Sequence, residues 1–374
     1  MKILLATMSM DIGGAETHIL ELAKELKNRG NDVSLVSSGG EYIKELEKCG
    51  VKIYNATLNS NHPFKMLKGY RELNRILKEE HFDIVHSHTR ISSFLLGLLS
   101  KKYKFPFITT DHGAFKVNTL FKMISNWGEY TLAVSEDLKR YLMDNYGLSE
   151  DKIAITVNGI DTQKFSKNID VSSLFNEFDI DSNAYKVVHV SRLDVETTVV
   201  TKQLIEASKT LAVEIPNLQV IIVGDGTDYE NVKVLADEVN KAFNRSVVKL
   251  VGKRTDVYRF DAMADVFVGV SRAALEAMSA EKPAIISGSE GYLGILDENT
   301  IKKAIDTNFC CRGLETSDVS KIVNDLKKIY SKSAQEIEKM GDFNKNVVIE
   351  NYSVNKMVND AEKAYKIVLE MHKK

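Results

Sequence analysis

The sequence of 374 residues has little of what stabilises small secreted domains or marks disordered linkers. Its three cysteines, Cys49, Cys310 and Cys311, cannot make a disulfide framework, and two of them are neighbours in the chain. We therefore expect a reducing, cytoplasmic setting. With four prolines and no low-complexity stretch, the chain also has little room for long disordered linkers.

An excess of charge and long apolar runs are absent as well. The 50 lysines and arginines are matched by 52 aspartates and glutamates, and the net charge of −2 provides no general attraction to nucleic acid. No apolar run approaches the roughly 18 residues that a membrane-spanning helix requires. The short apolar run at Leu4 and Leu5 is soon interrupted by Asp11, which is unlike a signal peptide.

What the chain does contain is a regular alternation of short apolar runs with helical patterns. The predicted strands are 2–6, 32–37, 83–87, 107–110, 132–135 and 153–157 in the first half, and 186–190, 219–223, 247–251, 265–270 and 284–287 in the second. Runs that are apolar almost throughout are typical of parallel strands covered on both faces. The length suits two domains of roughly 180 residues, so we predict an α/β protein with two doubly wound, Rossmann-like domains.

A polar stretch at 158–183 separates the two series of strands and begins with a turn-forming Asn-Gly pair. We expect an N-terminal domain at 1–165 and a C-terminal domain at 166–353. After about Thr316 only helical patterns remain. The last of them, in the region 354–374, is expected to cross back and complete the first domain. Ligands of such domains bind beyond the carboxyl ends of the strands, and two sets of these ends can face each other across a cleft.

Two features follow strands of the first domain. Gly13 and Gly14 open a helix that also carries Glu16, and backbone amides at a helix start suit an anion or a sugar oxygen. The alternative is a simple tight turn between strand and helix.

Histidines stand at the ends of two further strands of this domain, namely His86 and His88 at one and His112 at the next. No carboxylate or cysteine is spaced with them as in a known zinc site, so we expect no metal there. Hydrogen bonding to a polar ligand is the favoured interpretation of these imidazoles.

The second domain has charged residues and glycines after its strands. Arg192 follows the first strand and is suited to hold a diphosphate, the alternative being an ion pair with Asp194 or Glu196. Gly224 belongs to a Gly-x-Gly sequence, but Tyr229 replaces the third glycine of a dinucleotide fingerprint, which disfavours a dehydrogenase. Lys253 and Arg254 follow another strand and could contact a base.

A longer pattern lies at 264–278. Gly269 ends a strand, Ser271 is expected to cap the following helix, and the amides of Val270, Ser271 and Arg272 are placed to receive phosphate oxygens. Glu276 could accept ribose hydroxyls. Its alternative role is a glutamate favoured by the helix dipole.

The order of these segments resembles that of the family-four retaining glycosyltransferases (glycosyl transferases group 1), which have the GT-B architecture of two Rossmann-like domains. The resemblance covers nearly the whole chain. It rests on Gly-Gly-Ala-Glu at 13–16, His-Ser-His at 86–88, Asp-His-Gly at 111–113, Ala-Val-Ser-Glu at 133–136, Val-Asn-Gly-Ile-Asp at 157–161, Ser-Arg-Leu at 191–193, Val-Gly-Asp-Gly at 223–226 and Leu-Glu-Ala-Met at 275–278.

The resemblance implies transfer of a hexose or N-acetylhexosamine from a nucleotide-sugar to a glycan, a lipid-linked or a small-molecule acceptor, as in cell-envelope glycan biosynthesis. Uridine is the favoured base and guanosine the next. No cofactor or metal is implied, because the nucleotide-sugar is a substrate and the leaving phosphate takes the acceptor's proton in a front-face reaction. The implied catalytic residues are His112, Arg192 and Glu276. The implied donor-binding residues are Gly13, Gly14, Arg192, Gly224, Lys253, Arg254, Gly269, Val270, Ser271, Arg272 and Glu276, and the acceptor side has Glu16, His88 and His112.

Two positions depart from the family pattern. Thr197 occupies the place of the lysine that commonly follows the arginine, and Val268 occupies the place of a sugar-binding glutamate. A shorter sugar loop could use Arg272 and the segment 288–292 instead. One alternative is a sugar-nucleotide 2-epimerase of the same architecture, although Val268 removes one of the carboxylates that it would require. The other, which both departures motivate, is a degenerate, non-catalytic subunit that binds sugar-nucleotides.

The segment 115–127 combines aromatic and aliphatic residues with Lys116 and Lys122. It is amphipathic and could touch an anionic membrane from the cytoplasmic side. The alternative is an ordinary helix that packs on its own domain.

Overall fold

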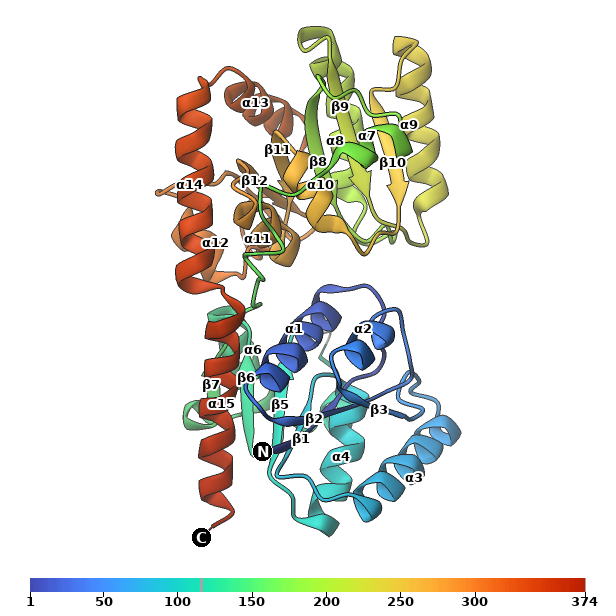
Figure 1. Ribbon diagram of the computed structural model, residues 1–374, viewed down its shortest axis with the longest axis vertical. Coiled ribbons are helices and arrows are strands. Elements are labelled where there is room, and N and C mark those ends of the chain that lie inside the picture. Colours follow the sequence, from blue (N-terminus) through green and yellow to red (C-terminus); the bar gives the residue numbers. More distant parts are fainter. Residues whose placement is uncertain (115–116, 374) are drawn as a thin grey trace. The chain divides into compact units, whose positions relative to one another are not determined.

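The computed structural model describes residues 1–114 and 117–373, which form two compact units (Figure 1). Unit 1 consists of Met1–Gly159 and Tyr352–Lys374, and unit 2 of Ile160–Asn351. Each unit has its own sheet with helices packed against it, as the alternation of strands and helices predicts.

Unit 1 contains a parallel sheet in the order β3-β2-β1-β4-β5-β6-β7. Its strands are β1 (Lys2–Ala6), β2 (Asp32–Ser37), β3 (Lys52–Asn55), β4 (Ile84–Ser87), β5 (Phe107–Asp111), β6 (Tyr130–Ala133) and β7 (Ile153–Ile155). Its helices are α1 (Gly14–Asn28), α2 (Ile43–Lys48), α3 (Pro63–Glu79), α4 (Arg90–Tyr103), α5 (Thr119–Met123), α6 (Glu136–Tyr146) and α15 (Val354–Met371). The strand order reverses at β1, between β2 and β4, which is the place where doubly wound sheets bind ligands.

Unit 2 contains a sheet in the order β10-β9-β8-β11-β12-β13, with β13 antiparallel to β12. Its strands are β8 (Tyr185–Val190), β9 (Leu218–Val223), β10 (Val248–Gly252), β11 (Val266–Gly269), β12 (Ala284–Gly288) and β13 (Gly291–Ile295). Its helices are α7 (Ser172–Glu177), α8 (Val199–Glu214), α9 (Tyr229–Phe243), α10 (Val257–Met263), α11 (Ser271–Ser279), α12 (Ile301–Asp306), α13 (Val319–Tyr330) and α14 (Ala334–Asn351).

A strand lies at every run that the sequence predicts, and β3 and β13 are additional. Strand β3 was missed because its four residues are only partly buried or exposed, so its apolar signal is weak. Strand β13 begins with Gly291 and contains Gly294, and glycines weaken a strand pattern. Both lie at the edges of their sheets.

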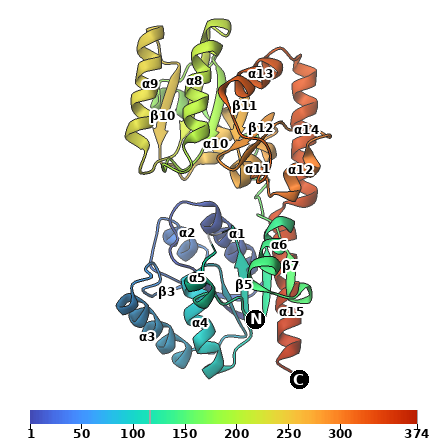
Figure 2. The same cartoon turned by 180° about the vertical axis from the view of Figure 1, so that it is seen from behind.

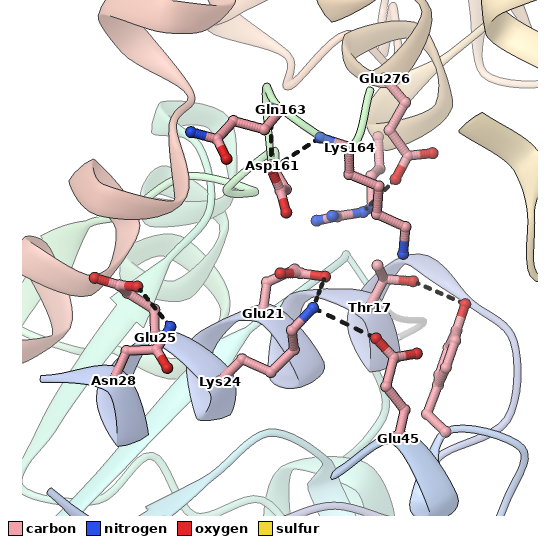
Figure 3. Close-up of polar contacts among 12 residues, drawn as sticks. Thr17, Glu21, Lys24, Glu25, Asn28, Glu45, Asp161, Gln163, Lys164 and Glu276 are labelled. Atoms are coloured by element: carbon pink, nitrogen blue, oxygen red, sulfur yellow. Dashed lines mark hydrogen bonds and ion pairs between the residues drawn. The ribbon is translucent and has the colours of Figure 1, made fainter. Parts of the chain in front are cut away.

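The division between the units lies at Gly159/Ile160, earlier than the expected 165/166. The reason is a turn at Asp161, whose Oδ1 accepts hydrogen bonds from the amides of Gln163 (3.0 Å) and Lys164 (3.1 Å) (Figure 3). The Phe165 carbonyl that follows accepts a hydrogen bond from Ser279 Oγ of unit 2 at 2.7 Å. The residues after Ile160 therefore belong to unit 2.

The return of the last helix to unit 1 is confirmed. Helix α15 contacts α1, β5, β6 and β7, and both views show it running along β6 and β7 (Figures 1 and 2). Its Asn359 and Glu362 accept hydrogen bonds from Arg29 Nη1 at 2.7 and 3.0 Å. The fully buried Tyr365 places its hydroxyl 2.9 Å from His86 Nδ1, beneath the end of β4.

Candidate functional site

Three histidines gather at the carboxyl edge of the unit 1 sheet. His88 follows β4 and His112 follows β5, and because these strands are parallel neighbours their ends lie at the same edge. His18 joins them from the first turns of α1, the helix after β1, which pairs with β4. His88 Nδ1 and His112 Nε2 are 3.1 Å apart, and the ring centroids of His18 and His112 are 4.8 Å apart.

His86, the fourth histidine of this region, has a structural role. Its Nδ1 lies 2.9 Å from Tyr365 Oη and its Nε2 lies 2.7 Å from Thr110 Oγ1, so both ring nitrogens have hydrogen-bond partners. Burial lowers the pKa of His86 to about 3. Burial also holds the pKa of His88 well below its ordinary range, with further contributions from the neighbouring imidazoles. Both rings are therefore neutral at pH 7, and His88 is a neutral hydrogen-bonding group.

His18 was not predicted as a site residue. In the sequence His18 is one polar residue within an amphipathic helix, and the helical pattern does not indicate which residues of other elements lie next to it. The only available signal is its position shortly after Gly13-Gly14, at the start of a helix that follows a central strand. The structure thus adds a third imidazole to the two expected on the acceptor side.

The glycine pair begins α1 as expected. Gly13 is the N-cap and Gly14 the first helical residue, and no side chain caps the helix. The Gly13 carbonyl accepts hydrogen bonds from the Thr17 amide (2.9 Å) and the Thr17 hydroxyl (2.8 Å). Glu16 lies in the first turn of the helix. The start of α1 and the histidines after β4 and β5 therefore meet at one edge of the sheet.

In unit 2, Arg192 follows β8 on a loop that is braced by two glycines. A Cβ atom at Gly224 would lie 1.8 Å from the Ser191 carbonyl oxygen, and one at Gly226 would lie 2.4 Å from Leu193. The Leu193 amide donates to the Asp225 carbonyl at 3.0 Å. The Gly-x-Gly sequence is therefore required by the close approach of the loops after β8 and β9.

The Arg192 side chain is 65% exposed, and its Nε lies 3.9 Å from Asp194 Oδ2. The ion pair with Asp194, which the sequence offered as the alternative role, is thus present at a long distance, while most of the guanidinium faces solvent. An exposed pair of this length contributes little to stability. The guanidinium remains accessible to a phosphate.

Lys202 does not replace the lysine that the family has at position 197. Its Nζ pairs with the buried Asp228 carboxylate at 2.5 Å, and the Thr198 hydroxyl donates to the same carboxylate at 2.6 Å. These hydrogen bonds, with one from Asn231, lower the pKa of Asp228. The Thr197 hydroxyl donates to the Arg192 carbonyl, so Thr197 shapes the arginine loop and supplies no second cation.

The two cations after β10 differ in their surroundings. Lys253 is exposed. Arg254 forms a two-point pair with Asp256 (2.7 and 2.8 Å) and donates through Nη1 to Glu177 Oε1 at 2.7 Å, while its guanidinium lies 5.2 Å from the Phe178 ring centroid. Arg254 thus fastens the start of unit 2 to β10.

The segment after β11 differs from the expected cap. Val270 is the N-cap of α11, and Ser271 is the first residue of the helix with a φ of +56°, so Ser271 does not cap it. The Ser271 amide donates to the Phe309 carbonyl at 2.9 Å. Of the three amides expected to receive phosphate, this one is already used within the fold. Phe309 and its neighbour Asn308 also have positive φ values, of 58° and 51°.

Arg272 and Glu276 form a buried pair on α11. Arg272 Nε donates to Glu276 Oε1 at 2.8 Å, and 5% of Arg272 and 8% of Glu276 is exposed. The Nη1 and Nη2 atoms of Arg272 are buried and have no hydrogen-bond partner among residues 1–114 and 117–373. Strands β11 and β8 are parallel neighbours, so Arg272 and Arg192 follow adjacent strands at the same sheet edge.

Val268 faces the apolar core. It is fully buried in the cluster that includes Val187 and Ile285, and its carbonyl accepts a hydrogen bond from His189 Nδ1 at 2.7 Å. Position 268 therefore cannot serve as the sugar-binding glutamate position. Only Val270 separates the end of β11 from the start of α11, so the loop in which the resemblance places the sugar-binding glutamate is short here.

The candidate membrane segment 115–127 is described only in part, because Phe115 and Lys116 lie outside the described residues. Phe121 lies under the Arg90 guanidinium at 4.7 Å, and Trp127 packs edge-on against Tyr146 at 4.9 Å. Met123 is 72% exposed. No helix among the described residues is long and apolar enough to cross a membrane.

Family models match both halves of the chain. The model described as Glycosyltransferase Family 4 matches residues 12–164, and the model described as Glycosyl transferases group 1 matches residues 170–347. The chain belongs to glycosyltransferase family 4. It is a glycosyltransferase with the GT-B fold, and the two matched regions correspond to the two Rossmann-like units.

Relatives of this glycosyltransferase cover nearly its full length. An uncharacterized glycosyltransferase of Methanocaldococcus jannaschii is 26% identical over 95% of each chain. The N-acetyl-alpha-D-glucosaminyl L-malate synthase of Bacillus anthracis is 23% identical over 96% of this chain and 95% of its own. The UDP-Gal:alpha-D-GlcNAc-diphosphoundecaprenol alpha-1,3-galactosyltransferase of Escherichia coli is 24% identical over 95% of this chain and 94% of its own.

Solved structures share the fold. A glycosyltransferase of Rickettsia africae has a TM-score of 0.78 at 22% identity, covering 98% of each chain. Anabaena Alr3699/HepE in complex with UDP and glucose has a TM-score of 0.77 at 18% identity, covering 98% of this chain and 99% of its own.

Proposed function

We propose that this glycosyltransferase moves a hexose or N-acetylhexosamine from a UDP-sugar to a lipid-linked, glycan or small-molecule acceptor, with retention at the anomeric carbon and without a metal. One observation carries the donor side. Arg272 is buried with both Nη atoms lacking a partner among the described residues, at the sheet edge that also carries the exposed Arg192. Buried Nη groups without an acceptor are costly, and the oxygens of a diphosphate would satisfy them.

On this proposal the diphosphate lies between the arginines that follow β8 and β11. Arg192 and Arg272 bind its oxygens, and both stabilise the charge that develops on the leaving group. Glu276, oriented by Arg272 Nε, accepts a hydrogen bond from a ribose hydroxyl. The loop residues Gly224, Gly269, Val270 and Ser271 border the diphosphate in this proposal, and Lys253 flanks the base.

Unit 1 supplies the acceptor side in this proposal. His112 contacts the transferred sugar, and His88 orients His112 through the 3.1 Å contact. Gly13 and Gly14 lie beside the donor phosphate and the acceptor, and Glu16 borders the acceptor. The leaving phosphate takes the acceptor's proton, so no protein nucleophile is required. The name of the Escherichia coli relative specifies a diphosphoundecaprenol-linked acceptor, which supports a lipid-linked acceptor here.

A donor and acceptor screen tests this function. UDP-, GDP- and ADP-sugars are incubated with polyprenyl-diphosphate-linked saccharides and with small hydroxy acids, and the product's anomeric configuration is read by NMR. We expect transfer from a UDP-sugar with an unchanged anomeric configuration and a rate that EDTA does not lower. An inverted product, or epimerised nucleotide-sugar formed without any acceptor, would contradict the proposal.

We also propose that the protein works at the cytoplasmic face of a membrane and touches anionic lipid through α5. Met123 and Lys122, an apolar and a basic residue, are exposed side by side on α5 and support this proposal, whereas Phe121 and Trp127 pack on unit 1. Sedimentation with anionic vesicles tests it. Binding that falls with salt and is reduced in Met123→Ser/Lys122→Ser is expected, and equal sedimentation with neutral vesicles would contradict it.

A further inference from the structure

Three histidines of unit 1 are close enough together to form a transition-metal site. One ring nitrogen each from His18, His88 and His112 lies within 4.8 Å of the corresponding atoms of the other two. The three residues come from α1, from the end of β4 and from the end of β5, so each is held by a different element of the sheet edge. Imidazole suits zinc, copper, nickel and iron, whereas magnesium and calcium prefer oxygen ligands.

We propose that His18, His88 and His112 bind one divalent transition-metal ion, Zn²⁺ foremost, with a fourth position open to water. Three protein ligands plus an open position is the arrangement of zinc sites that exchange their fourth ligand. The ion would replace the hydrogen bond between His88 Nδ1 and His112 Nε2. The proton of that bond would move to the other nitrogen of its own ring, so both imidazoles stay neutral. No covalent change in the protein is required.

The distances favour this assignment. Two ligand nitrogens around a tetrahedral zinc ion with bonds of about 2.0–2.1 Å lie about 3.3–3.4 Å apart. His88 Nδ1 and His112 Nε2 are 3.1 Å apart, which is close to that separation. One ring nitrogen of His18 lies within 4.8 Å of a ring nitrogen of each of the other two histidines, so the rings need to turn only until their lone pairs converge on one point.

The surroundings favour it as well. His88 is 4% exposed, and its Nε2 is buried without a hydrogen-bond partner among residues 1–114 and 117–373, so the ring has polar capacity that the fold does not use. His112 is only half-buried, which gives an ion access. His86 is excluded as a ligand because Tyr365 and Thr110 occupy both of its nitrogens.

The expected consequence for catalysis is inhibition, a statement that rests on the proposed function. An ion on His112 would prevent that side chain from contacting the transferred sugar. The reaction itself needs no metal, so zinc would lower activity and a chelator would restore it.

Metal binding is tested separately from activity. The purified full-length protein is stripped with chelator, titrated with Zn²⁺ against a fluorescent zinc indicator, and then loaded with Co²⁺ for visible spectroscopy. We expect one tight zinc ion per chain and the strong visible bands of tetrahedral cobalt with nitrogen and oxygen ligands. Thiolate charge-transfer bands would instead place the metal on cysteines and overturn the proposal.

The variants His18→Ala and His112→Ala should each weaken zinc binding by at least about 100-fold. Loss of a residue that only supports a ligand typically lowers metal affinity by about 10–100-fold, and loss of a ligand itself should lower it by no less. His81→Ala, at an exposed histidine outside the cluster, is the matched control and should bind like the wild type. Circular dichroism and thermal melting establish that each variant is folded. Absence of stoichiometric zinc binding in the folded wild type, or unchanged affinity in folded His112→Ala, would overturn the proposal. Neither outcome depends on transferase activity, so failure here leaves the proposed function intact.

Discussion

Arg272 donates through Nε to Glu276 Oε1 at 2.8 Å, one turn apart on α11, and both side chains are almost completely buried. The hydrogen bond from Nε holds the guanidinium in place, and its two Nη groups have no partners among the described residues. This arrangement orients Arg272 before a donor arrives. Donor binding then loses little additional conformational entropy of this long side chain.

Arg272→Lys should weaken UDP binding by one to two orders of magnitude. Lysine keeps the charge but lacks the planar fork that binds two oxygens, and each lost charge-assisted hydrogen bond is worth about 1.5–3 kcal/mol. Isothermal titration with UDP measures the effect. Arg259→Lys is a control, because Arg259 is a unit 2 arginine whose guanidinium binds Ser173 Oγ and the Asp170 carbonyl. Equal affinities of Arg272→Lys and wild type would remove Arg272 from the donor site.

Arg192→Ala should reduce kcat/KM by at least about tenfold while leaving the melting temperature nearly unchanged. The side chain is mostly exposed and its ion pair with Asp194 is long, so little folding energy depends on it. A donor that stabilises the leaving diphosphate contributes mainly in the transition state, so the loss should be largest in kcat. Steady-state kinetics together with thermal melting check both parts. A large drop in melting temperature with normal kinetics would assign Arg192 a structural role.

Gly224→Ala should destabilise unit 2 and lower donor affinity together. An added Cβ would lie 1.8 Å from the Ser191 carbonyl, so the loop that carries Arg192 would have to move. Gly252→Ala is the matched control, because Gly252 also has a positive φ but a Cβ there meets nothing within 4 Å in the part of the chain that the structure describes. We expect the control to lose about 1 kcal/mol of folding free energy, from backbone strain, and to keep its affinity for UDP. Denaturant unfolding and UDP titration of both variants measure this, and similar donor affinities in the two would contradict the bracing role.

His189→Asn should make folding stability less dependent on pH between 7 and 5. The His189 Nδ1–H donates to the Val268 carbonyl at 2.7 Å and Nε2 accepts from the Thr201 hydroxyl at 2.9 Å, and burial lowers the pKa of this imidazole. Below the unfolded pKa of about 6.5, the unfolded chain takes up a proton that the folded chain refuses, so stability falls as the pH falls. Each such histidine can contribute up to about 1.36 kcal/mol per pH unit.

Urea unfolding at several pH values measures the slope for the His189 prediction. His81→Asn, at an exposed site, serves as control and should keep the wild-type slope. An identical slope in wild type and His189→Asn would show that His189 is protonated in the folded state.

The sequence allowed the two sheets to be predicted because parallel strands buried on both faces are apolar along their whole length. Positions that follow such strands are also predictable, and this is why Arg192, His88 and His112 could be proposed as candidate site residues. The edge strands β3 and β13 were missed because exposure and glycines remove that signal. The apolar face of α1 is visible in the sequence, whereas the neighbours of its polar residue His18 depend on where β4 and β5 end.

The loop after β11 shows a second kind of limit. A serine before a helix usually caps it, but here the Ser271 amide binds the Phe309 carbonyl and the serine adopts a positive φ. That contact is between residues far apart in the chain and leaves no local pattern. In the same way, the role of Arg254 depends on Glu177, and the role of Lys202 depends on Asp228. Tertiary ion pairs decide which cations are available to a ligand, and spacing in the sequence does not reveal them.

The central claim is that unit 2 binds a nucleotide through its diphosphate. It is tested most directly by titrating the wild-type protein with UDP and with uridine under the same conditions. The account predicts that UDP binds at least about 100-fold more tightly, because several charge-assisted hydrogen bonds to the diphosphate are lost with uridine. It also predicts that this difference shrinks in Arg192→Ala and Arg272→Lys. Equal affinities for UDP and uridine would contradict the claim.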